Sequence, residues 1–462
     1  MARTDRSRPS RGPRNTAVAP LYQRLPHGPH RLGADAVTRN QRSRMHGAMI
    51  EAIATSGYER TSVKQVVGLA GVSRRSFYEQ FANKQDCFLA TFDVIAARSA
   101  GRVSAAYRAA DGDAPQRMHA AFGELTQTIS ANRKSAHLAI VEAPKAGAPA
   151  LLRLRRASAT FEQMLSGCLE QTSPTGPLPA PVIRGIAGGL HAAMSHCLLE
   201  GSAETAPELA EEMLRWTLLF QTPAAKLLAQ RLAERARRAL AQGRKPPAAV
   251  GRAPSTLVGD GRERLLEQAL KLAVIDGYRE LSAPQIADAA DVSIAEFFEL
   301  FDGKDDCFLA ALDMLGERLI AFASDEQLRS PRWPHAVRRT IGELLGYLAA
   351  HPVYARTIAE GAFAAGAEAI ERNVALTQEI ATRLTEGAPE QARSALALQG
   401  VAGALSHTVR CHVASGQFQL LSVLSDYLTY IVLTPFIGSE QAAELVIADA
   451  SDVCAEGAAR SR

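Results

Sequence analysis

The stretch AGVSRRSFYEQFANKQDCFLA, residues 70–90, decides the fold of the first half of the chain. Gly71 allows a tight turn, because glycine enters the left-handed backbone conformation without strain. Ser73 is a residue type that caps helix N-termini. Phe77 and Phe81 are four residues apart and therefore share one face of a helix. These features predict a short helix that follows a glycine turn.

The residues before this stretch complete a helix-turn-helix. Apolar residues recur at steps of three and four over 45–53, which predicts one face of a helix. Gly57 is suited to end that helix, and Ser62 can cap a second short helix. Two short helices joined by a glycine turn form a helix-turn-helix. A long helix is expected to follow over 85–107.

The same frame occurs again 220 positions later, as AADVSIAEFFELFDGKDDCFLA at 289–310. Roughly 17 of 37 positions are identical between 57–93 and 277–313, with no gap. Fainter matches continue through each half, such as GIAGGL from position 185 and GVAGAL from position 400. The repeat unit is therefore a whole domain of about 200 residues.

Composition is consistent with two or more soluble helical domains. The chain has 462 residues, is Ala- and Leu-rich and contains only 6% aromatic residues. No apolar run reaches the roughly 18 residues of a membrane span, and no apolar signal core opens the chain, so we expect a cytoplasmic protein. The six cysteines form no CxxC pair, which favours buried apolar roles over disulfides.

One pattern in the first half resembles a known family. Ser62-x3-Val66-x3-Ala70-Gly71-Val72-Ser73-x3-Phe77-Tyr78-x2-Phe81-x2-Lys84 is similar to the N-terminal DNA-binding signature of TetR-type transcriptional repressors. The resemblance is strong over roughly fifty residues here and weaker over a similar length in the second half. It implies an all-α fold of two tandem TetR-like units, each a three-helix helix-turn-helix domain followed by a helical ligand and dimerisation domain.

The resemblance and the composition together predict the domain organisation. A Pro- and Gly-punctuated segment between the halves predicts a linker. The expected regions are a basic disordered arm (1–38), a helix-turn-helix domain (39–93), a helical regulatory and dimerisation domain (94–239), the linker (240–261), a degenerate acidic helix-turn-helix domain (262–313) and a second regulatory and dimerisation domain (314–450).

The first helix-turn-helix carries the side chains that DNA recognition requires. Arginine can make a paired hydrogen bond to guanine O6 and N7 in the major groove, and Arg74 and Arg75 open the predicted recognition helix. The resemblance assigns backbone contacts to Tyr78 and Lys84, and a solvated helix face is the alternative for the arginines. The candidate DNA-contacting residues are Ser62, Lys64, Ser73, Arg74, Arg75, Ser76, Tyr78, Gln80 and Lys84.

The N-terminal arm is strongly basic although the chain as a whole has a net charge of only +4. Residues 1–44 contain ten arginines against Asp5 and Asp35, a net charge of +8. Such an arm can enter the minor groove beside a helix-turn-helix, or it can serve as a solubilising tail. Both interpretations stay open on the sequence alone.

The second helix-turn-helix keeps the frame and loses the basic residues. Residues 57–93 carry five basic against four acidic residues, whereas 277–313 carry two against nine. A net charge of −7 is repelled by a phosphate backbone. The positions of Arg74, Arg75, Ser76 and Tyr78 are occupied by Ile294, Ala295, Glu296 and Phe298. We therefore predict a second domain that folds without reading DNA, with Ile294 and Phe298 free for packing or for a partner.

Small residues in two matching helices predict how the halves pair. The resemblance implies that the last helices of each unit form a dimer interface, and Gly188 and Gly403 in those helices permit close approach, so we expect an intrachain pseudo-dimer there, with a homodimer as the alternative. His407 and Cys411 share a helix face beside His412 and are possible zinc ligands. No further ligand stands at motif spacing, so core or interface packing is the favoured interpretation. The sequence thus predicts neither a metal nor a cofactor.

These observations favour a ligand-responsive transcriptional repressor, associated with the nucleoid, that binds double-stranded DNA and an unidentified small-molecule effector. The alternative is an interaction or scaffold protein of TetR-like fold whose DNA-binding heads are both vestigial. An enzyme is disfavoured, because the sequence contains no P-loop, GxGxxG, HExxH or GxSxG pattern.

Overall fold

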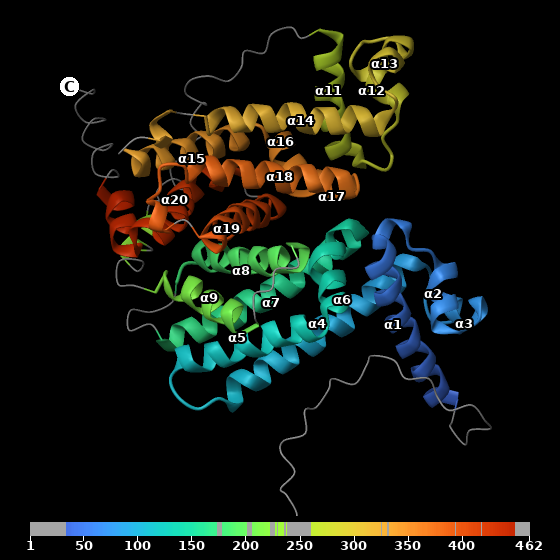
Figure 1. Ribbon diagram of the computed structural model, residues 1–462. Coiled ribbons are helices and arrows are strands. Elements are labelled where there is room, and N and C mark those ends of the chain that lie inside the picture. The colour runs from blue at the N-terminus through green and yellow to red at the C-terminus, as the bar shows by residue number, and fades with distance from the viewer. Residues whose placement is uncertain are drawn as a thin grey trace, which may run out of the picture. The chain divides into compact units, whose positions relative to one another are not determined.

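The computed structural model describes residues 34–448 apart from 173–177, 201–205, 222–226, 229, 235–236, 238–259, 325, 330–331, 393 and 417. The described residues form helices and no strand, which confirms the all-α prediction (Figure 1). Most of the expected linker and of the basic arm lies outside the described residues. None of the described helices is long and apolar enough to cross a membrane. The chain divides into two compact units, one ending at Thr91 and the other beginning at Phe92.

The first unit is the helix-turn-helix. Its helices are α1 (Ala34–Arg60), α2 (Val63–Ala70), α3 (Arg74–Tyr78) and the first residues of α4 (Lys84–Ala109). Its core is built from fully buried side chains at the expected helical spacing. The largest of these are Met45, Met49, Ile53, Phe77, Phe81 and Phe88.

Local backbone chemistry explains the three short elements. Gly57 has φ 73° and interrupts α1, which continues for one more turn. Ser62 and Gln65 form a reciprocal capping box at the start of α2, and Gly71, with φ 61°, ends that helix in the left-handed conformation. Ser73 caps α3 through the backbone N–H of Ser76. The predicted turn and caps are therefore confirmed.

The expected disordered arm extends too far, because α1 begins at Ala34 and not after residue 38. Arginine-rich composition suggested disorder up to residue 38, but residues 34–38 open α1, and the next residues of that helix make tertiary contacts. The Arg42 guanidinium lies 4.6 Å from the centroid of the Phe81 ring, and Arg44 Nη2 donates to the Gly71 carbonyl at 2.9 Å. Asp35 in the first turn also favours the helix N-terminus.

The second unit contains the helices that follow the helix-turn-helix in both halves. The first half contributes the rest of α4, then α5 (Ala114–Ala131), α6 (Arg133–His137), η1 (Leu138–Glu142), η2 (Ala143–Ala146), α7 (Ala148–Thr172), α8 (Ala180–Glu200) and α9 (Ala206–Leu218). The second half contributes α14 (Lys304–Phe322), η4 (Glu326–Arg329), α15 (Trp333–Ala350), α16 (Pro352–Arg356), η5 (Thr357–Gly361), α17 (Ala362–Ala364), α18 (Ala367–Leu384), η6 (Glu390–Ala392), α19 (Ala395–Ala414), η7 (Phe418–Leu420) and α20 (Leu421–Ile437).

The second helix-turn-helix belongs to this unit and repeats the geometry of the first. It comprises α11 (Gly261–Leu272), η3 (Ala273–Gly277), α12 (Ala283–Ala289), α13 (Ile294–Leu300) and the start of α14. Asp291 stands where the first copy has Gly71 and takes φ 52°, a left-handed conformation that aspartate tolerates better than most residues. The turn therefore survives the loss of its glycine.

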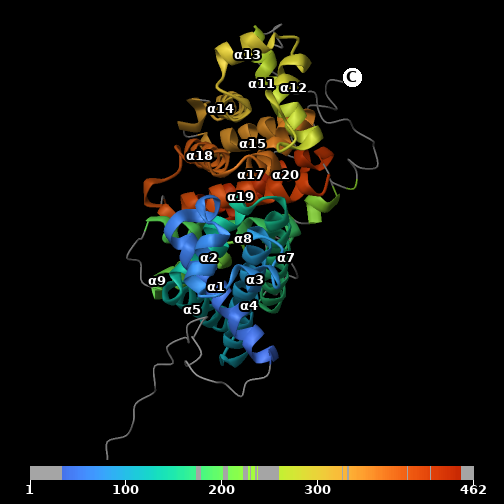
Figure 2. The same ribbon diagram turned by 90° about the vertical axis from the view of Figure 1, so that its right-hand side faces the viewer.

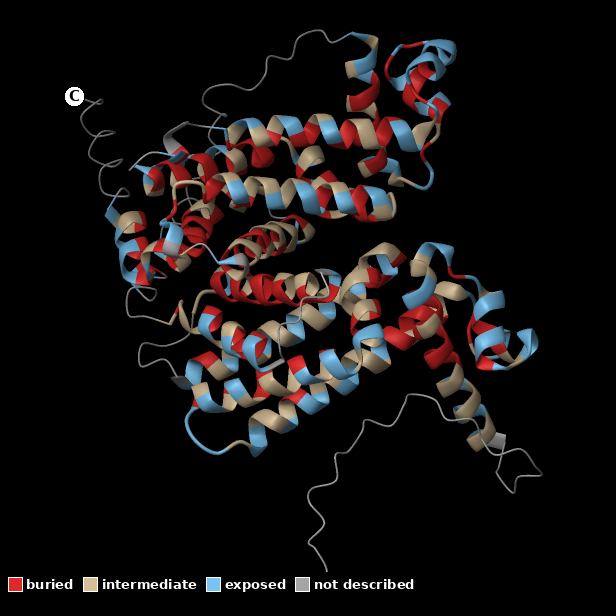
Figure 3. Cartoon of the chain, viewed as in Figure 1, coloured by how far each residue is buried: buried red, intermediate tan, exposed pale blue. Residues whose placement is uncertain are grey.

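The two halves meet at α8 and α19, which lie side by side in both views (Figures 1 and 2). A Cβ added to Gly188 would lie 2.5 Å from the Gly403 carbonyl oxygen, and one added to Gly403 would lie 2.3 Å from the Gly188 oxygen. Real Cβ atoms do not approach so closely, so the contact requires glycine at both positions. The predicted close approach is confirmed, and α8 is buried along most of its length (Figure 3).

Candidate nucleic-acid interface and effector pocket

The start of α3 presents two arginines to solvent. Phe77 is completely buried and fixes the helix, whereas Arg74 and Arg75 are exposed and Tyr78 is 56% exposed. Arg74 makes no hydrogen bond or ion pair with any residue that the structure describes. Arg75 Nε lies 2.9 Å from Glu79 Oε1, with both side chains largely in solvent. Arg74 can thus bind a ligand directly, whereas Arg75 must first break its ion pair with Glu79.

The N-terminus of α2 offers a second set of polar groups. Ser62 and Lys64 are both exposed there. The Ser62 backbone N–H donates to Gln65 Oε1 at 2.7 Å, and its hydroxyl accepts from the Gln65 backbone N–H. Lys64 forms no contact of this kind with the described residues, so its ammonium group is available to a phosphate.

Two of the predicted contact residues, Ser76 and Gln80, are half-buried. The Ser76 hydroxyl lies 2.9 Å from the Ser73 hydroxyl, which also caps the helix. The amide oxygen of Gln80 is buried without a hydrogen-bond partner. Both side chains would have to rotate to reach a base edge, which ranks them below Arg74 and Arg75.

Lys84 has a different place from the one expected. Its ammonium group donates to the carbonyl oxygens of Tyr58 at 2.9 Å and Glu59 at 3.2 Å, and it lies 4.3 Å from the Tyr58 ring centroid. Burial lowers its pKa. The matching Lys304 of the acidic copy makes the same carbonyl contacts, at 2.9–3.3 Å. Because both copies keep this contact, and only the first has basic residues at the reading positions, we interpret it as structural. In the first copy it joins α4 to the end of α1.

Arg42 and Arg44 of α1 were counted in the basic charge of residues 1–44, and the structure shows both in contacts within the helix-turn-helix. Arg42 packs on Phe81 and Arg44 holds the turn at Gly71, as described above. Arg262 and Arg264 repeat these contacts in the second copy, with Arg264 Nε 2.9 Å from the Ala290 carbonyl. The 220-residue repeat was the signal that could have identified them as structural.

The second helix-turn-helix keeps the core geometry of the first, but its surface is acidic and partly apolar. The Phe297 and Phe301 rings are 5.6 Å apart at 49°, as are Phe77 and Phe81. Ile294, Phe298 and Leu300 are 43%, 56% and 40% exposed on α13. No basic side chain occupies a position corresponding to Arg74 or Arg75.

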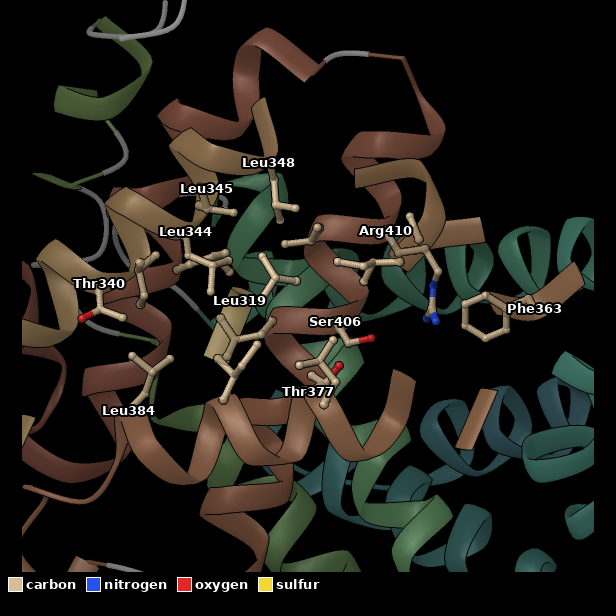
Figure 4. A pocket seen from close by; sticks show the side chains of 18 residues that line it. Leu319, Thr340, Leu344, Leu345, Leu348, Phe363, Thr377, Leu384, Ser406 and Arg410 are labelled. Carbon is tan, nitrogen blue, oxygen red and sulfur yellow. The ribbon is translucent and has the colours of Figure 1, made fainter. Parts of the chain in front are cut away.

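An apolar pocket lies among the helices of the second half that follow its helix-turn-helix (Figure 4). Leucine and isoleucine side chains of α14, α15, α18 and α19 form most of its wall, with residues of η5 and Phe363 at one side. Its lining includes three hydroxyl residues, Thr340, Thr377 and Ser406. Arg410 is the one charged residue of the lining and lies beside Phe363.

A polar cluster from both halves lies at the contact between α7 and α19. His407 Nε2 is 2.8 Å from Glu162 Oε1 and 3.7 Å from Cys411 Sγ. Burial lowers the pKa of His407, but the hydrogen bonds to Cys411 and Glu162 outweigh this and leave it raised. Burial raises the pKa of the Cys411 thiol, but the hydrogen bond and charge of the neighbouring His407 outweigh burial, so the pKa of Cys411 is lowered overall.

Glu162, His407 and Cys411 have the atom types of a metal site, with ligating atoms all within 4.8 Å of one another. Two arginine side chains stand against the cluster. Arg410 Nη2 is 3.3 Å from His407 Nδ1, and Arg184 Nε is 3.8 Å from Glu162 Oε2. A neutral imidazole that binds a metal through Nε2 carries its proton on Nδ1, where Arg410 also directs an N–H. This geometry favours a hydrogen-bonded contact over a metal site.

Comparison with known proteins agrees with the repeat. The model of bacterial regulatory proteins of the tetR family, a non-enzymatic family, matches residues 48–91 and again 265–311. No curated protein matches the chain.

Three solved structures illustrate the similarity. The fatty acid degradation regulator FadR from Bacillus halodurans is 17% identical over 38% of this chain and 96% of its own, with a TM-score of 0.35. FadR from Bacillus subtilis in complex with stearoyl-CoA is 16% identical over 38% and 96%, also at 0.35. A transcriptional regulator from Rhodococcus sp. Rha1 is 26% identical over 40% and 97%, at 0.32. The chain therefore carries two regions, one in each half, that match the model of the bacterial regulatory proteins of the tetR family.

Proposed function

We propose that this protein is a ligand-responsive transcriptional repressor that reads its operator with the first helix-turn-helix alone. The observation that carries the proposal is the exposed pair Arg74 and Arg75 at the N-terminus of α3. Recognition helices commonly present base-reading side chains there. Tyr78 on α3, with Ser62 and Lys64 at the start of α2, adds exposed groups suited to phosphates. The second head offers nine acidic residues against two basic ones over its corresponding segment.

The regulatory role rests on the pocket of the second half. Ligand sites are mostly apolar concavities with a few polar groups that fix orientation, and this pocket has that composition. We place the two TetR-like units on either side of the 240–261 linker, paired within one chain through α8 and α19. The protein would act in the cytoplasm at the nucleoid.

Selection of bound fragments from random duplexes with the purified full chain tests DNA reading. We expect a recovered half-site, which Arg74→Ala combined with Arg75→Ala no longer enriches. Arg279→Ala, which removes an exposed arginine from the second head, is the matched control and should enrich the same site. Recovery of no sequence by the parent chain, or of the same sequence by the double variant, would refute the proposed reading head.

A second candidate function is an interaction protein with two vestigial heads. The exposed Ile294, Phe298 and Leu300 on the acidic α13 favour it. Such a protein predicts no salt-sensitive binding to duplex DNA, whereas a reading head releases counterions and loses affinity as salt rises. A salt titration of duplex binding therefore separates the two functions.

A further inference from the structure

Arg410 is an unusual residue to line an apolar pocket. Its guanidinium has five N–H donors and a permanent charge. Among the described residues no carboxylate lies within ion-pair distance of it, and its nearest polar partner is His407 Nδ1, 3.3 Å from Nη2. The guanidinium carbon also lies 5.5 Å from the Phe363 ring centroid. Arg410 is half-buried, and charges withdrawn from water are normally paired, so this end of the pocket lacks an anion.

His407, the partner of Arg410, connects the pocket to a residue of the first half. Because a guanidinium can only donate, we assign His407 Nδ1, 3.3 Å from Arg410 Nη2, as the acceptor, which places the ring proton on Nε2, 2.8 Å from Glu162 Oε1. Glu162 belongs to α7 of the first half. One side chain thus separates the pocket from a contact between the two halves.

A second ion pair joins the same elements. Arg155 Nη2 on α7 lies 2.6 Å from Glu360 Oε1 on η5. Glu360 directly follows Ala359, which lines the pocket. A change in η5 or α19 on filling the pocket therefore acts on α7 at two points.

Contacts of α7 continue to the helix that carries the first head. Arg153 Nε lies 3.0 and 2.9 Å from the two carboxylate oxygens of Asp93 on α4. α4 is one continuous helix that begins at Lys84, directly after the reading elements. The contacts thus run from the pocket of the second half to a helix that starts in the first helix-turn-helix.

We propose that the pocket binds an amphipathic anion, an apolar chain ending in a carboxylate, and that the carboxylate draws Arg410 away from His407 and so alters the α7–α19 contact. Arginine and carboxylate form strong, often bidentate hydrogen bonds. The second half then senses the ligand for the first half. This inference rests on the proposed function in its last step only, the change in DNA binding.

Isothermal titration of the full chain with octanoate and with 1-octanol tests the ligand class. Both have the same apolar chain, and only octanoate offers a carboxylate. We expect octanoate to bind and Arg410→Gln to weaken it roughly ten- to a hundredfold, the worth of a hydrogen bond to a charged group. Arg156→Gln, at an exposed arginine on α7, is the matched control and should bind normally. Equal affinity for acid and alcohol, absent octanoate binding, or an unaffected Arg410→Gln variant overturns the assignment.

Amide hydrogen exchange tests the relay without relying on DNA. Octanoate should change exchange over α7 and α4 of the parent chain, and Glu162→Gln should still bind octanoate while losing that change. Unaltered exchange in the parent, or an equal response in Glu162→Gln, overturns the relay. A duplex titration with and without octanoate then addresses the proposed function, and failure to bind any duplex would count against that function while the exchange result stands.

Discussion

Arg74 and Arg75 are neighbours, but within the described part of the unbound protein only Arg75 forms an ion pair. Truncating each one separately is therefore informative. An arginine that donates to both O6 and N7 of a guanine contributes about 1 to 3 kcal/mol of specificity, or roughly five- to more than a hundredfold in affinity. Arg74 has no partner among the described residues, so its truncation loses this contribution in full. Arg75 must first break its exposed pair with Glu79, 2.9 Å away. Such helix pairs are worth about 0.3–0.5 kcal/mol, so the Arg75→Ala loss should be smaller by that amount if both contacts are equal.

The third variant of this series is Glu79→Ala. It frees Arg75 and removes one negative charge beside the phosphates, so it should raise duplex affinity, most at low salt. Fluorescence anisotropy with the selected duplex and a scrambled one, each over a salt series, measures all three variants. Arg74→Ala should reduce the preference for the selected duplex while circular dichroism stays unchanged. Unchanged preference in both arginine variants, or weaker binding by Glu79→Ala, would refute the reasoning.

Three further predictions concern the frame around the reading head. Lys84→Ala should lower the melting temperature, because it releases the carbonyls of Tyr58 and Glu59, and Lys84→Arg should recover part of the loss; an unchanged melting temperature would contradict the structural role. Deleting residues 1–33, with seven arginines against one aspartate, should leave the helical circular dichroism intact and make the dependence of log affinity on log salt shallower; an unchanged slope would favour a solubilising tail. Gly188→Ala should destabilise the chain by about 1–3 kcal/mol in urea unfolding, since its Cβ meets Gly403, whereas Gly123→Ala, with open space at its Cβ, should not.

The elements decided by local chemistry were predictable from the sequence. The caps at Ser62 and Ser73 and the turn at Gly71 each depend on residues within four positions, and the helix-turn-helix follows from them. The glycine contact between α8 and α19 was predictable because the repeat placed Gly188 and Gly403 in matching helices.

Long-range contacts set the limit of that prediction. Lys84 was expected at DNA because its bonds to the end of α1 join residues about 25 positions apart. Likewise His407 and Cys411 had no further ligand at motif spacing, since Glu162 lies 245 positions from His407 in the chain. No periodicity or spacing rule encodes such contacts. The start of α1 at Ala34 was also hidden, because composition describes the arginines without their packing partners.

The central claim is that one of two structurally similar heads reads DNA. Two-fold dimers place their recognition helices about 34 Å apart on palindromic sites. A chain with one basic head should instead protect a single half-site per chain. The most direct measurement is a hydroxyl-radical footprint at one chain per operator, with Glu296→Ala compared with Arg74→Ala plus Arg75→Ala. We predict a one-sided footprint that the arginine variant abolishes and Glu296→Ala leaves unchanged. A symmetric palindromic footprint from one chain, lost on mutating Glu296, would contradict the claim.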